Sequence, residues 1–510
     1  MSNSTISSQT YDLLVIGGGI NGVGIARDGA GRGLKTCLVE MNDLASATSS
    51  WSTKLIHGGL RYLEQYEFKL VRESLIEREI LLNAAPHLIE PLRFILPHHR
   101  GLRPAWLLRL GLYLYDTLGG RRLLPPTSKI DLKSGIYGMP LKAEYARGFE
   151  YSDCRADDAR LVVVNAQDAA EHGADVLTRT KFVGAKRDGA IWRVTISMDG
   201  KKQTLTTRAI VNAAGPWVTS IFDNIEGAEP AKGLRLVKGS HIFTKQLFDH
   251  EKAYIFQHKD KRVVFAIPYG NDLTLVGTTD EPYEGDPSKA AISEEETTYL
   301  LEAVSQYFKR PVTQDDVVST YSGVRPLFDD LSKDTAAKVT RDYAFDLQGE
   351  EGQAPLLSVY GGKLTTYRKL ALDALNTLRD HLPEMGRSWT KEAPLPGGRM
   401  GYEGMAEWRT DMRSKYGFLP EAARERMISA YGFRLTRVLG NAVNREDLGQ
   451  SFGGELYEAE LRYMRDVEWA RTAEDALNRR SKLYLVLSED EQKAVQAWFD
   501  ANPVETALAA

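Results

Sequence analysis

The sequence predicts an α/β protein that begins with a βαβ unit, continues into an antiparallel sheet and ends in an all-helical region. Residues 11–16 form an apolar run that ends in glycines, which is typical of a buried parallel strand. Residues 253–257, 262–268 and 273–278 are rich in β-forming residues and indicate an antiparallel sheet. Residues 402–500 are charged and helix-periodic, with few strand signals.

The first unit can be followed along the chain. Residues 20–31 have a helical pattern and residues 34–40 read as a second strand, so a βαβ unit starts almost at the first residue. Residues 66–85 and 160–172 are further expected helices, and a last βα unit is expected over residues 356–379. The change in character after residue 390 indicates a domain boundary there.

Length and composition limit the class of protein. A chain of 510 residues is too long for one core and suggests about two to four domains. The net charge of -4 gives no overall attraction to nucleic acid. Two cysteines, Cys37 and Cys154, cannot form a disulfide framework and suit a reducing compartment. We expect no signal peptide, because the start is polar, and no transmembrane helix, because no apolar run is long enough.

The first glycine-rich turn carries a dinucleotide-binding pattern. Gly17, Gly19 and Gly22 fit the pattern G-x-G-x-x-G between a strand and a helix. Glycines let a phosphate approach the backbone, and the helix N-terminus offers free N–H groups. Glu40 ends the second strand, where a carboxylate can accept hydrogen bonds from ribose hydroxyls. A glycine-rich turn in an unrelated α/β protein is the alternative.

Two later segments favour FAD over NAD, which share this pattern. The strand before Ala214, Gly215 and Trp217 ends in small residues, where a backbone can pass beside a cofactor. Residues 358–367 repeat the order of strand, glycines and helix, and include Gly362, Lys363, Leu364 and Thr365. A helix N-terminus there could face the electron-rich end of a reduced flavin. The segment is not a magnesium-binding P-loop, because Leu364 replaces the Ser or Thr, and the sequence has no metal motif.

A hydroxyl-rich loop follows Glu40. We expect it to hydrogen-bond the pyrophosphate and the flavin, although a solvated loop held by its own turns is the alternative. Its candidate residues are Ser46, Thr48, Ser49 and Ser50, followed by Ser52 and Thr53.

Cations and histidines supply candidates for substrate chemistry. Arginine can bind phosphate oxygens in pairs, and the candidate cations are Arg61, Arg325, Arg341 and Lys363. Arg325 could instead form an interdomain salt bridge, and Arg341 an ion pair with its neighbour Asp342. His57 and His241 lie in what reads as loop context. We favour His241 beside a substrate hydroxyl and His57 beside the flavin, with a purely structural histidine as the alternative for each.

Residues 98–124 combine five arginines with one acid and with tryptophan and tyrosines among leucines. This combination suits a segment that lies at a membrane surface, where aromatic side chains sit at headgroup level. A helix packed between domains is the alternative.

Together these motifs resemble a known family. The order runs from GGGINGVG through STKLIHGGLRY, residues 52–62, to KGSH, YSGVRPL and GGKLTTYRK, residues 361–369. It closely resembles the FAD-dependent glycerol-3-phosphate dehydrogenases of the bacterial aerobic type, over about residues 11–500. The runs at residues 52–62 and 361–369 are specific, whereas the glycine pattern alone is not.

The resemblance implies oxidation of sn-glycerol 3-phosphate to dihydroxyacetone phosphate, with electrons passed through FAD to ubiquinone or a similar quinone. It implies a homodimer held peripherally at the cytoplasmic face of the inner membrane. It also implies an FAD-binding domain of the glutathione-reductase type. We expect that Rossmann-like domain over 11–85, 150–233 and 318–385, after a polar tail at 1–10, with a substrate domain over 86–149 and 234–317 and a helical C-terminal domain over 391–510.

The resemblance places Arg61, Tyr62, His241, Arg325, Arg341 and Lys363 in the substrate site, and we assign catalysis to His241, Arg325 and Lys363. Lys54, Gly58 and Gly59, from the run around His57, are assigned to cofactor binding. Two alternatives stay open: a soluble glycerophosphate oxidase that reduces oxygen, and a regulatory protein whose flavin senses redox state.

Overall fold

The computed structural model describes residues 10–99, 101–120, 123–230, 233–258, 260, 262–270, 272–329 and 342–504. The expected polar tail, apart from Thr10, lies outside the described residues. Arg341, one of the expected substrate cations, also lies outside them.

The first sheet is mainly parallel and contains the βαβ unit that the sequence predicts. Strands β18, β10, β1, β2 and β7 are parallel neighbours in that order, while β17 joins β18 and the β8–β9 hairpin joins β10 in antiparallel pairing. Their apolar runs are buried on both faces, as parallel sheets require. The bounds are β1 Tyr11–Ile16, β2 Thr36–Val39, β7 Asp175–Leu177, β8 Thr180–Asp188, β9 Ile191–Met198, β10 Lys201–Asn212, β17 Ala344–Gln348 and β18 Leu356–Tyr360.

Three helices cover one face of this sheet: α1 (Ile20–Gly31), α4 (Asp158–Glu171) and α6 (Tyr367–Thr377). Helix α1 contacts both α4 and α6, and all three share a buried apolar core with β1. Gly24 allows this close packing, because a Cβ there would come within 2.7 Å of the Tyr367 ring. The packing fixes the start of α1 relative to the late βα unit.

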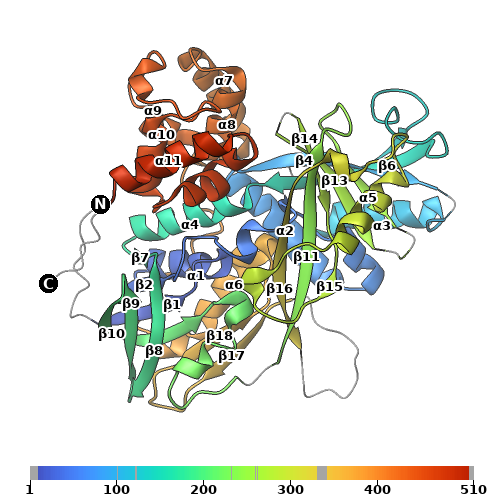
Figure 1. The fold of residues 1–510 in the computed structure, drawn as a ribbon. Coiled ribbons are helices and arrows are strands. Elements are labelled where there is room, and N and C mark those ends of the chain that lie inside the picture. The colour runs from blue at the N-terminus through green and yellow to red at the C-terminus, as the bar shows by residue number, and fades with distance from the viewer. Residues whose placement is uncertain are drawn as a thin grey trace.

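The second sheet is mainly antiparallel, as predicted, with one parallel pair between β12 and β4. It faces helices α2 (Phe68–Ala84), α3 (Ala105–Leu118) and α5 (Glu294–Ser305). Figure 1 places it beside the first sheet, with its long strands β11 and β16 running side by side. The bounds are β3 Leu55–Ile56, β4 Ile89–His98, β5 Ser128–Asp131, β6 Arg147–Ala156, β11 Gly233–Lys245, β12 Ala253–Gln257, β13 Val263–Tyr269, β14 Leu273–Gly277, β15 Glu281–Pro282 and β16 Val317–Asp329.

Strand β16 departs from the expected domain division. The division assigned residues 318–385 to the nucleotide-binding domain, but β16 pairs along its length with β11 of the second sheet. The strands β3 and β6 also belong to the second sheet, although they lie mostly in segments assigned to the first. Such pairings join residues far apart in the chain, so no local pattern announces them.

The C-terminal region is helical, as predicted, and packs around a core of its own. Its helices are α7 Gly401–Lys415, α8 Glu421–Tyr431, α9 Leu435–Leu439, α10 Glu458–Val467 and α11 Glu489–Ala501, with a π-helical segment at Asp475–Ser481. Figure 1 shows these helices stacked on α4, on the side away from the β8–β9 hairpin. A buried ion pair joins this region to the first sheet's helices: Arg160 of α4 donates to both oxygens of Glu468, from Nη1 at 2.8 Å and from Nη2 at 2.7 Å.

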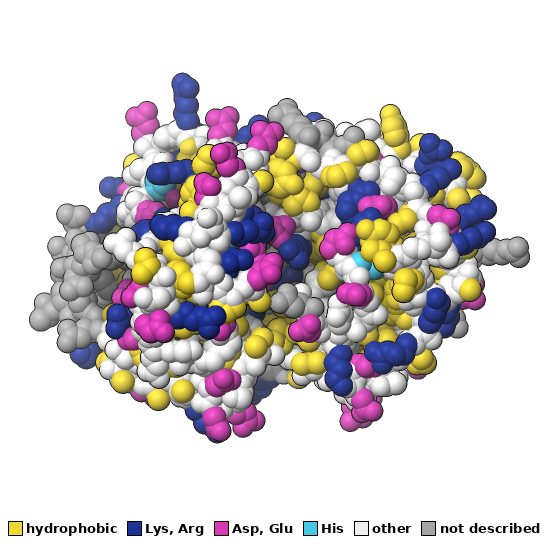
Figure 2. All heavy atoms as spheres, turned by 90° about the horizontal axis from the view of Figure 1, so that it is seen from above, with side chains coloured by type: hydrophobic (Ala, Val, Ile, Leu, Met, Phe, Trp, Pro, Cys, Tyr) yellow, Lys and Arg dark blue, Asp and Glu magenta, His cyan; other side chains and the backbone are white. Residues whose placement is uncertain are grey.

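The surface carries both signs of charge. On the face in Figure 2, Lys and Arg are interspersed with Asp and Glu, and apolar patches lie between them. Charges of both signs are therefore mixed on that face. Among the described residues, the helices are too short or too polar for any of them to cross a bilayer.

His87 is buried where the C-terminal region meets the rest of the molecule. It is 1% exposed and packs against Gly397 and Gly432. Burial, and then the charges of Arg160, Arg409 and Arg434, lower the pKa of His87 to about 3. The folded protein therefore holds this ring neutral where an unfolded chain would bind a proton.

We predict that this histidine makes the fold sensitive to acid. Below a pH of about 6.5 the unfolded chain binds a proton that the folded one does not, so stability falls as the pH drops toward 3. Between pH 7.5 and 4.5, His87→Gln should therefore lose roughly 2 kcal/mol less of its free energy of unfolding than the parent does. Urea unfolding at the two pH values measures it, with exposed His381→Gln as the control. If the free energy of unfolding of His87→Gln fell between the two pH values as much as that of the parent, His87 would not be the source of the acid sensitivity.

Candidate functional site

A cavity of about 280 Å³ lies at the carboxyl ends of β1, β10 and β18. It is lined by Gly19–Asn21 after β1, by Ala213 and Gly215 after β10, and by Gly361–Thr365 after β18. Because these three strands are parallel neighbours, the segments that follow them emerge at one edge of the sheet. The three small-residue segments singled out in the sequence therefore border one cavity.

The first turn requires its glycines. Gly17 has a φ of +111°, and a Cβ there would come within 2.6 Å of the Ala213 carbonyl oxygen. A Cβ on Gly22 would come within 1.9 Å of the Gly17 carbonyl oxygen, so the helix could not start this close to the strand. The Glu40 carboxylate accepts a hydrogen bond from Gly18 N at 2.7 Å and so holds the turn from the second strand.

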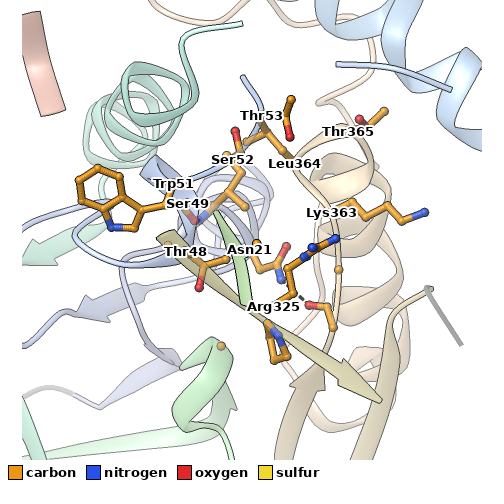
Figure 3. Close-up of a pocket in the computed structure, with 18 of the residues that line it drawn as sticks. Asn21, Thr48, Ser49, Trp51, Ser52, Thr53, Arg325, Lys363, Leu364 and Thr365 are labelled. Carbon is orange, nitrogen blue, oxygen red and sulfur yellow. Dashed lines mark hydrogen bonds between the residues drawn. The ribbon is translucent and has the colours of Figure 1, made fainter. Parts of the chain in front are cut away.

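Asn21 links the first turn to the late one. Its Nδ2 donates to the Gly361 carbonyl oxygen at 3.1 Å, while its Oδ1 is buried and has no hydrogen-bond partner among the described residues. Gly361 and Gly362 have φ values of +76° and +96°, which favour glycine. In Figure 3 Asn21 and Arg325 lie between the hydroxyl-rich loop on one side and Lys363 on the other. A glycine-bordered cavity with an unsatisfied acceptor in its wall fits a bound dinucleotide.

The hydroxyl-rich loop forms another wall. Thr48, Ser49, Ser52 and Thr53 line the cavity, and Ser49 Oγ accepts a hydrogen bond from Ile20 N at 3.0 Å. Ser50 points away, since its hydroxyl donates to the Ala45 carbonyl oxygen at 2.6 Å. The loop therefore serves both the cavity and its own conformation, which combines the two interpretations of the sequence.

The expected cofactor residues divide into two groups. Those that line the cavity are Gly19, Thr48, Ser49, His57, Gly215, Gly362, Lys363, Leu364 and Thr365. The others are not among the described lining residues and stand behind or beside them: Gly17, Gly22, Glu40, Ser46, Ser50, Lys54, Gly58, Gly59, Ala214 and Trp217. The side chain of Lys54 points to Asp158, at 2.9 Å, rather than into the cavity.

Two of the expected cations reach the cavity. Arg325 enters from β16, where its Nη2 lies 3.1 Å from Asp280 Oδ1 and 3.2 Å from the Thr279 carbonyl oxygen. Lys363 follows the late glycines, and its Nζ lies 4.3 Å from the centre of the Tyr62 ring. Tyr62 lines the cavity from the 3-10 helix Leu60–Gln65, whereas the neighbouring Arg61 is not among the described lining residues.

His241 lies in the middle of strand β11, so the expectation of a loop there is wrong. Gly239 and Ser240, just before it, suggested a loop, but both lie within the strand. Gly277 of the neighbouring strand β14 pairs with His241, and a Cβ on Gly277 would come within 2.1 Å of the ring. The imidazole stacks on Tyr321 at 4.7 Å, and its Nε2 lies 2.9 Å from Thr53 Oγ1. The ring is thus held on three sides.

Both histidines of the cavity stay neutral at ordinary pH. Burial lowers the pKa of His241 well below its usual value, and the charges of Lys54 and Arg325 lower it further. Burial also lowers the pKa of His57, against the opposing charge of Asp153. A neutral imidazole is the form that can accept a proton.

Sequence reasoning missed several lining residues, among them Asn21, Trp51, Thr278, Asp280 and Asp342. Asn21 lies inside the glycine pattern, and its position just before the third glycine, Gly22, was a usable signal. Asp280, beside Arg325, and Asp342 add acidic groups to the cavity lining, which no local pattern indicated. The cavity is therefore less uniformly basic than the sequence suggested.

Comparison with known proteins places this architecture in a family. The family model described as FAD dependent oxidoreductase matches residues 12–368, and the model described as C-terminal domain of alpha-glycerophosphate oxidase matches residues 388–501. The first match covers well over half of the chain and includes every lining segment of the cavity. This chain is an FAD-dependent oxidoreductase.

Relatives of the oxidoreductase are similar over nearly their whole length. D-erythritol 1-phosphate dehydrogenase of Brucella abortus is 52% identical, over 96% of this chain and 98% of that protein. Aerobic glycerol-3-phosphate dehydrogenase of Escherichia coli is 50% identical, over 96% and 97%. The structure of glycerol-3-phosphate dehydrogenase from Bacillus halodurans complexed with FAD is 27% identical, with a TM-score of 0.74, over 99% of this chain and 96% of that one. The chain belongs to the family that includes the glycerol-3-phosphate dehydrogenases.

The cofactor of the oxidoreductase is FAD, and its cavity suits that cofactor. We propose that Gly19 and Ser49 lie beside the pyrophosphate, at the N-terminus of α1, where helix N–H groups favour negative charge. We place Gly362 and Leu364 beside the flavin, because they follow β18 and line the same cavity.

The late turn gives a direct test of cofactor binding. At Gly362, with its φ of +96°, an alanine Cβ would come within 2.7 Å of Asn21 Nδ2. We predict that Gly362→Ala separates Asn21 from Gly361 and that the oxidoreductase is purified with less than half of its normal FAD. Gly173→Ala is the matched control, because Gly173 has a φ of +92° with nothing within 4 Å of the added Cβ.

Both substitutions carry the same backbone strain of about 1–2 kcal/mol, so both should lower the melting temperature slightly. Flavin absorbance against protein concentration separates them. Full FAD content in Gly362→Ala would remove the late turn from the cofactor site.

Proposed function

We propose that this enzyme oxidises sn-glycerol 3-phosphate to dihydroxyacetone phosphate and passes the electrons to a membrane quinone. One observation carries the proposal: two cations, Arg325 and Lys363, and a neutral histidine, His241, line the same cavity as the glycine turns. Relatives that are named for phosphorylated polyols, at 50–52% identity, support the same class of substrate.

The two cations give the phosphate its binding site. Arg325 presents a planar fork that can donate two hydrogen bonds to phosphate oxygens, and Lys363 adds a point charge. The Asp280 carboxylate, 3.1 Å from Arg325 Nη2, orients that fork within the cavity. Both side chains of this pair are partly exposed, so the pair adds little to stability and leaves Arg325 able to turn to a ligand. We keep Arg61 and Arg341 as proposed substrate residues from the resemblance.

His241 accepts the proton of the substrate hydroxyl in this proposal. Its ring is neutral because burial and two nearby cations lower its pKa, and its position is fixed by Thr53 and Tyr321. FAD, when bound, supplies the ring that takes the hydride from the alcohol carbon. Lys363 places positive charge at the flavin end of the cavity, where negative charge develops.

A second substrate is favoured by one specific observation. D-erythritol 1-phosphate dehydrogenase is 52% identical to this chain, against 50% for the aerobic glycerol-3-phosphate dehydrogenase. Both substrates offer a phosphate and a secondary alcohol, so the same cations and histidine would serve either. The four-carbon polyol adds one carbon with its hydroxyl, which the remaining cavity must accommodate.

We predict that anaerobic addition of glycerol 3-phosphate bleaches the bound FAD. Arg325→Met should raise the substrate concentration for half-maximal bleaching on the order of tenfold to a hundredfold, because charge-assisted hydrogen bonds are lost. FAD content should stay unchanged. Arg310→Met is the matched control, since Arg310 pairs with Asp316 outside the described cavity lining.

The same experiment separates the alternatives. A parent enzyme that stays yellow with both polyol phosphates would end the enzymatic proposal and favour a flavin sensor. A higher kcat/KM for D-erythritol 1-phosphate than for glycerol 3-phosphate would select the second substrate. Rapid peroxide formation when air is admitted to the bleached enzyme, with no reaction with ubiquinone, would select an oxygen-reducing oxidase.

Helix α3 is the proposed membrane contact. Trp106, Leu110 and Tyr113 lie four and three residues apart, so they share one face, and Trp106 and Tyr113 are 69% and 63% exposed. Leu112 and Tyr115 face the other way, into the core. An exposed aromatic face of this kind suits the headgroup region of a bilayer, where a quinone is available.

We predict that Trp106→Ser with Tyr113→Ser weakens binding to anionic lipid vesicles on the order of tenfold or more, because the exposed aromatic face is lost. Val443→Ser with Val486→Ser is the control pair, since both valines are exposed in the C-terminal region. Vesicle co-sedimentation measures binding. If the α3 pair bound as well as the parent did, α3 would not be the anchor.

The proposal also covers where the enzyme lies in the cell and how many copies assemble. We place the enzyme at the cytoplasmic face of the bacterial inner membrane, held peripherally through the α3 face. The resemblance supports a homodimer, which would carry two such faces. Two faces would strengthen binding, because the second contact forms at high effective concentration.

A further inference from the structure

Asp158, the first residue of α4, holds the cavity loop from behind. Its side chain is fully buried and does not appear among the described cavity-lining residues. Its oxygens lie 2.9 and 3.0 Å from Lys54 Nζ, and Oδ2 accepts hydrogen bonds from Ser52 N at 3.2 Å and from Ser52 Oγ at 2.8 Å. A buried charge is costly unless it is paired and hydrogen-bonded in this way. The Asp158 carboxylate therefore favours the one conformation of the loop in which all of these bonds form.

The bonds fix the two neighbours of Thr53. Lys54 N donates to Ser52 Oγ at 2.9 Å, and the Ser52 carbonyl oxygen accepts from Tyr321 OH at 2.7 Å. Lys54 has a φ of +58°, an uncommon conformation for a residue other than glycine. Thr53, held between these two residues, places its Oγ1 2.9 Å from His241 Nε2.

We propose that Asp158 is a positioning residue: through Ser52 and Lys54 it fixes Thr53 against His241 and so sets the orientation of the proposed base. The proposal rests on the proposed function, because it names what aligns the base of that reaction. Asp158 itself touches neither substrate nor cofactor in this arrangement.

The C-terminal region reaches the same carboxylate. Lys482 follows the π-helical segment, and its Nζ lies 4.0 Å from Asp158 Oδ1 and 3.4 Å from Asp157 Oδ1. The Lys482 side chain is almost buried. Asp158 therefore stands between the cavity loop and the C-terminal helices, so a disturbance of that region can reach Thr53 through a short chain of contacts.

The charged groups around His241 give opposite predictions for the two members of the ion pair. Lys54 and Arg325 face the ring and lower its pKa, while Asp158, with Asp157 and Lys482 behind it, offsets the charge of Lys54. Lys54→Met removes a positive charge and should raise the pKa of His241. Asp158→Asn leaves Lys54 uncompensated and should lower the pKa. Loss of folding alone would not produce opposite shifts.

The test is the pH dependence of flavin reduction by glycerol 3-phosphate in the FAD-loaded enzyme, followed by stopped flow. The acidic limb is first assigned with His241→Asn, which should abolish it. Lys54→Met should move the limb to higher pH and Asp158→Asn to lower pH. Each should slow reduction at its optimum about tenfold, since a misplaced base costs rate. KM should stay within about twofold, because Arg325 and Lys363 are untouched.

Asp168→Asn is the matched control on the same helix, because Asp168 forms a buried pair with Arg27 at 2.5 Å. It should lower stability and leave the pH profile in place. A parent that is not reduced by polyol phosphate defeats the proposed function, not the role of Asp158. If the parent is reduced, three results would overturn the proposal. The acidic limb could survive His241→Asn, it could stay in place in Lys54→Met and Asp158→Asn, or it could move in the same direction in both. If Asp158→Asn loses FAD, the direction of the Lys54→Met shift decides.

Discussion

The parallel alignment of β1, β10 and β18 is the constraint on which the site depends. The segments that follow parallel neighbouring strands emerge at the same edge of the sheet. The turns after β10 and β18 lie about 200 and 340 residues beyond the turn after β1, yet all three form walls of one cavity. The side chain of Asn21 then ties the first turn to the last through the Gly361 carbonyl oxygen. Without this alignment, the glycines would be isolated turns and would form no cofactor site.

The second sheet brings the proposed base and the proposed phosphate-binding residue to that edge. Antiparallel pairing of β11 with β16 and β14 sets His241 opposite Tyr321 and Gly277, which gives the imidazole one stacking partner and one gap to fill. Arg325 lies four residues along β16 from Tyr321, and therefore on the same face of the strand. One strand thus carries both the residue that stacks on the proposed base and the residue that would hold the phosphate.

Local patterns predicted what is local. The βαβ unit, the glycine turns, the late βα unit and the helical C-terminal region follow from periodicity and turn composition, and the structure has them at nearly the expected residues. The strand position of His241 was missed, because glycine and serine beside it imitate a loop. The membership of β16 in the second sheet and the pairing of Lys54 with Asp158 were missed too, because both depend on contacts between residues about 80 and 104 positions apart. Motif resemblance supplied the candidate substrate residues, and the cavity gathers Tyr62, His241, Arg325 and Lys363 from that set.

We propose that one cavity holds the whole FAD molecule between the two glycine turns, with Arg325 and His241 facing the flavin. A crystal structure of the FAD-loaded enzyme tests it most directly. We expect density for the pyrophosphate at the N-terminus of α1 and for the flavin ring against residues 361–365, within reach of both side chains. Density for the flavin elsewhere, or a ring separated from Arg325 and His241 by protein, would contradict the account.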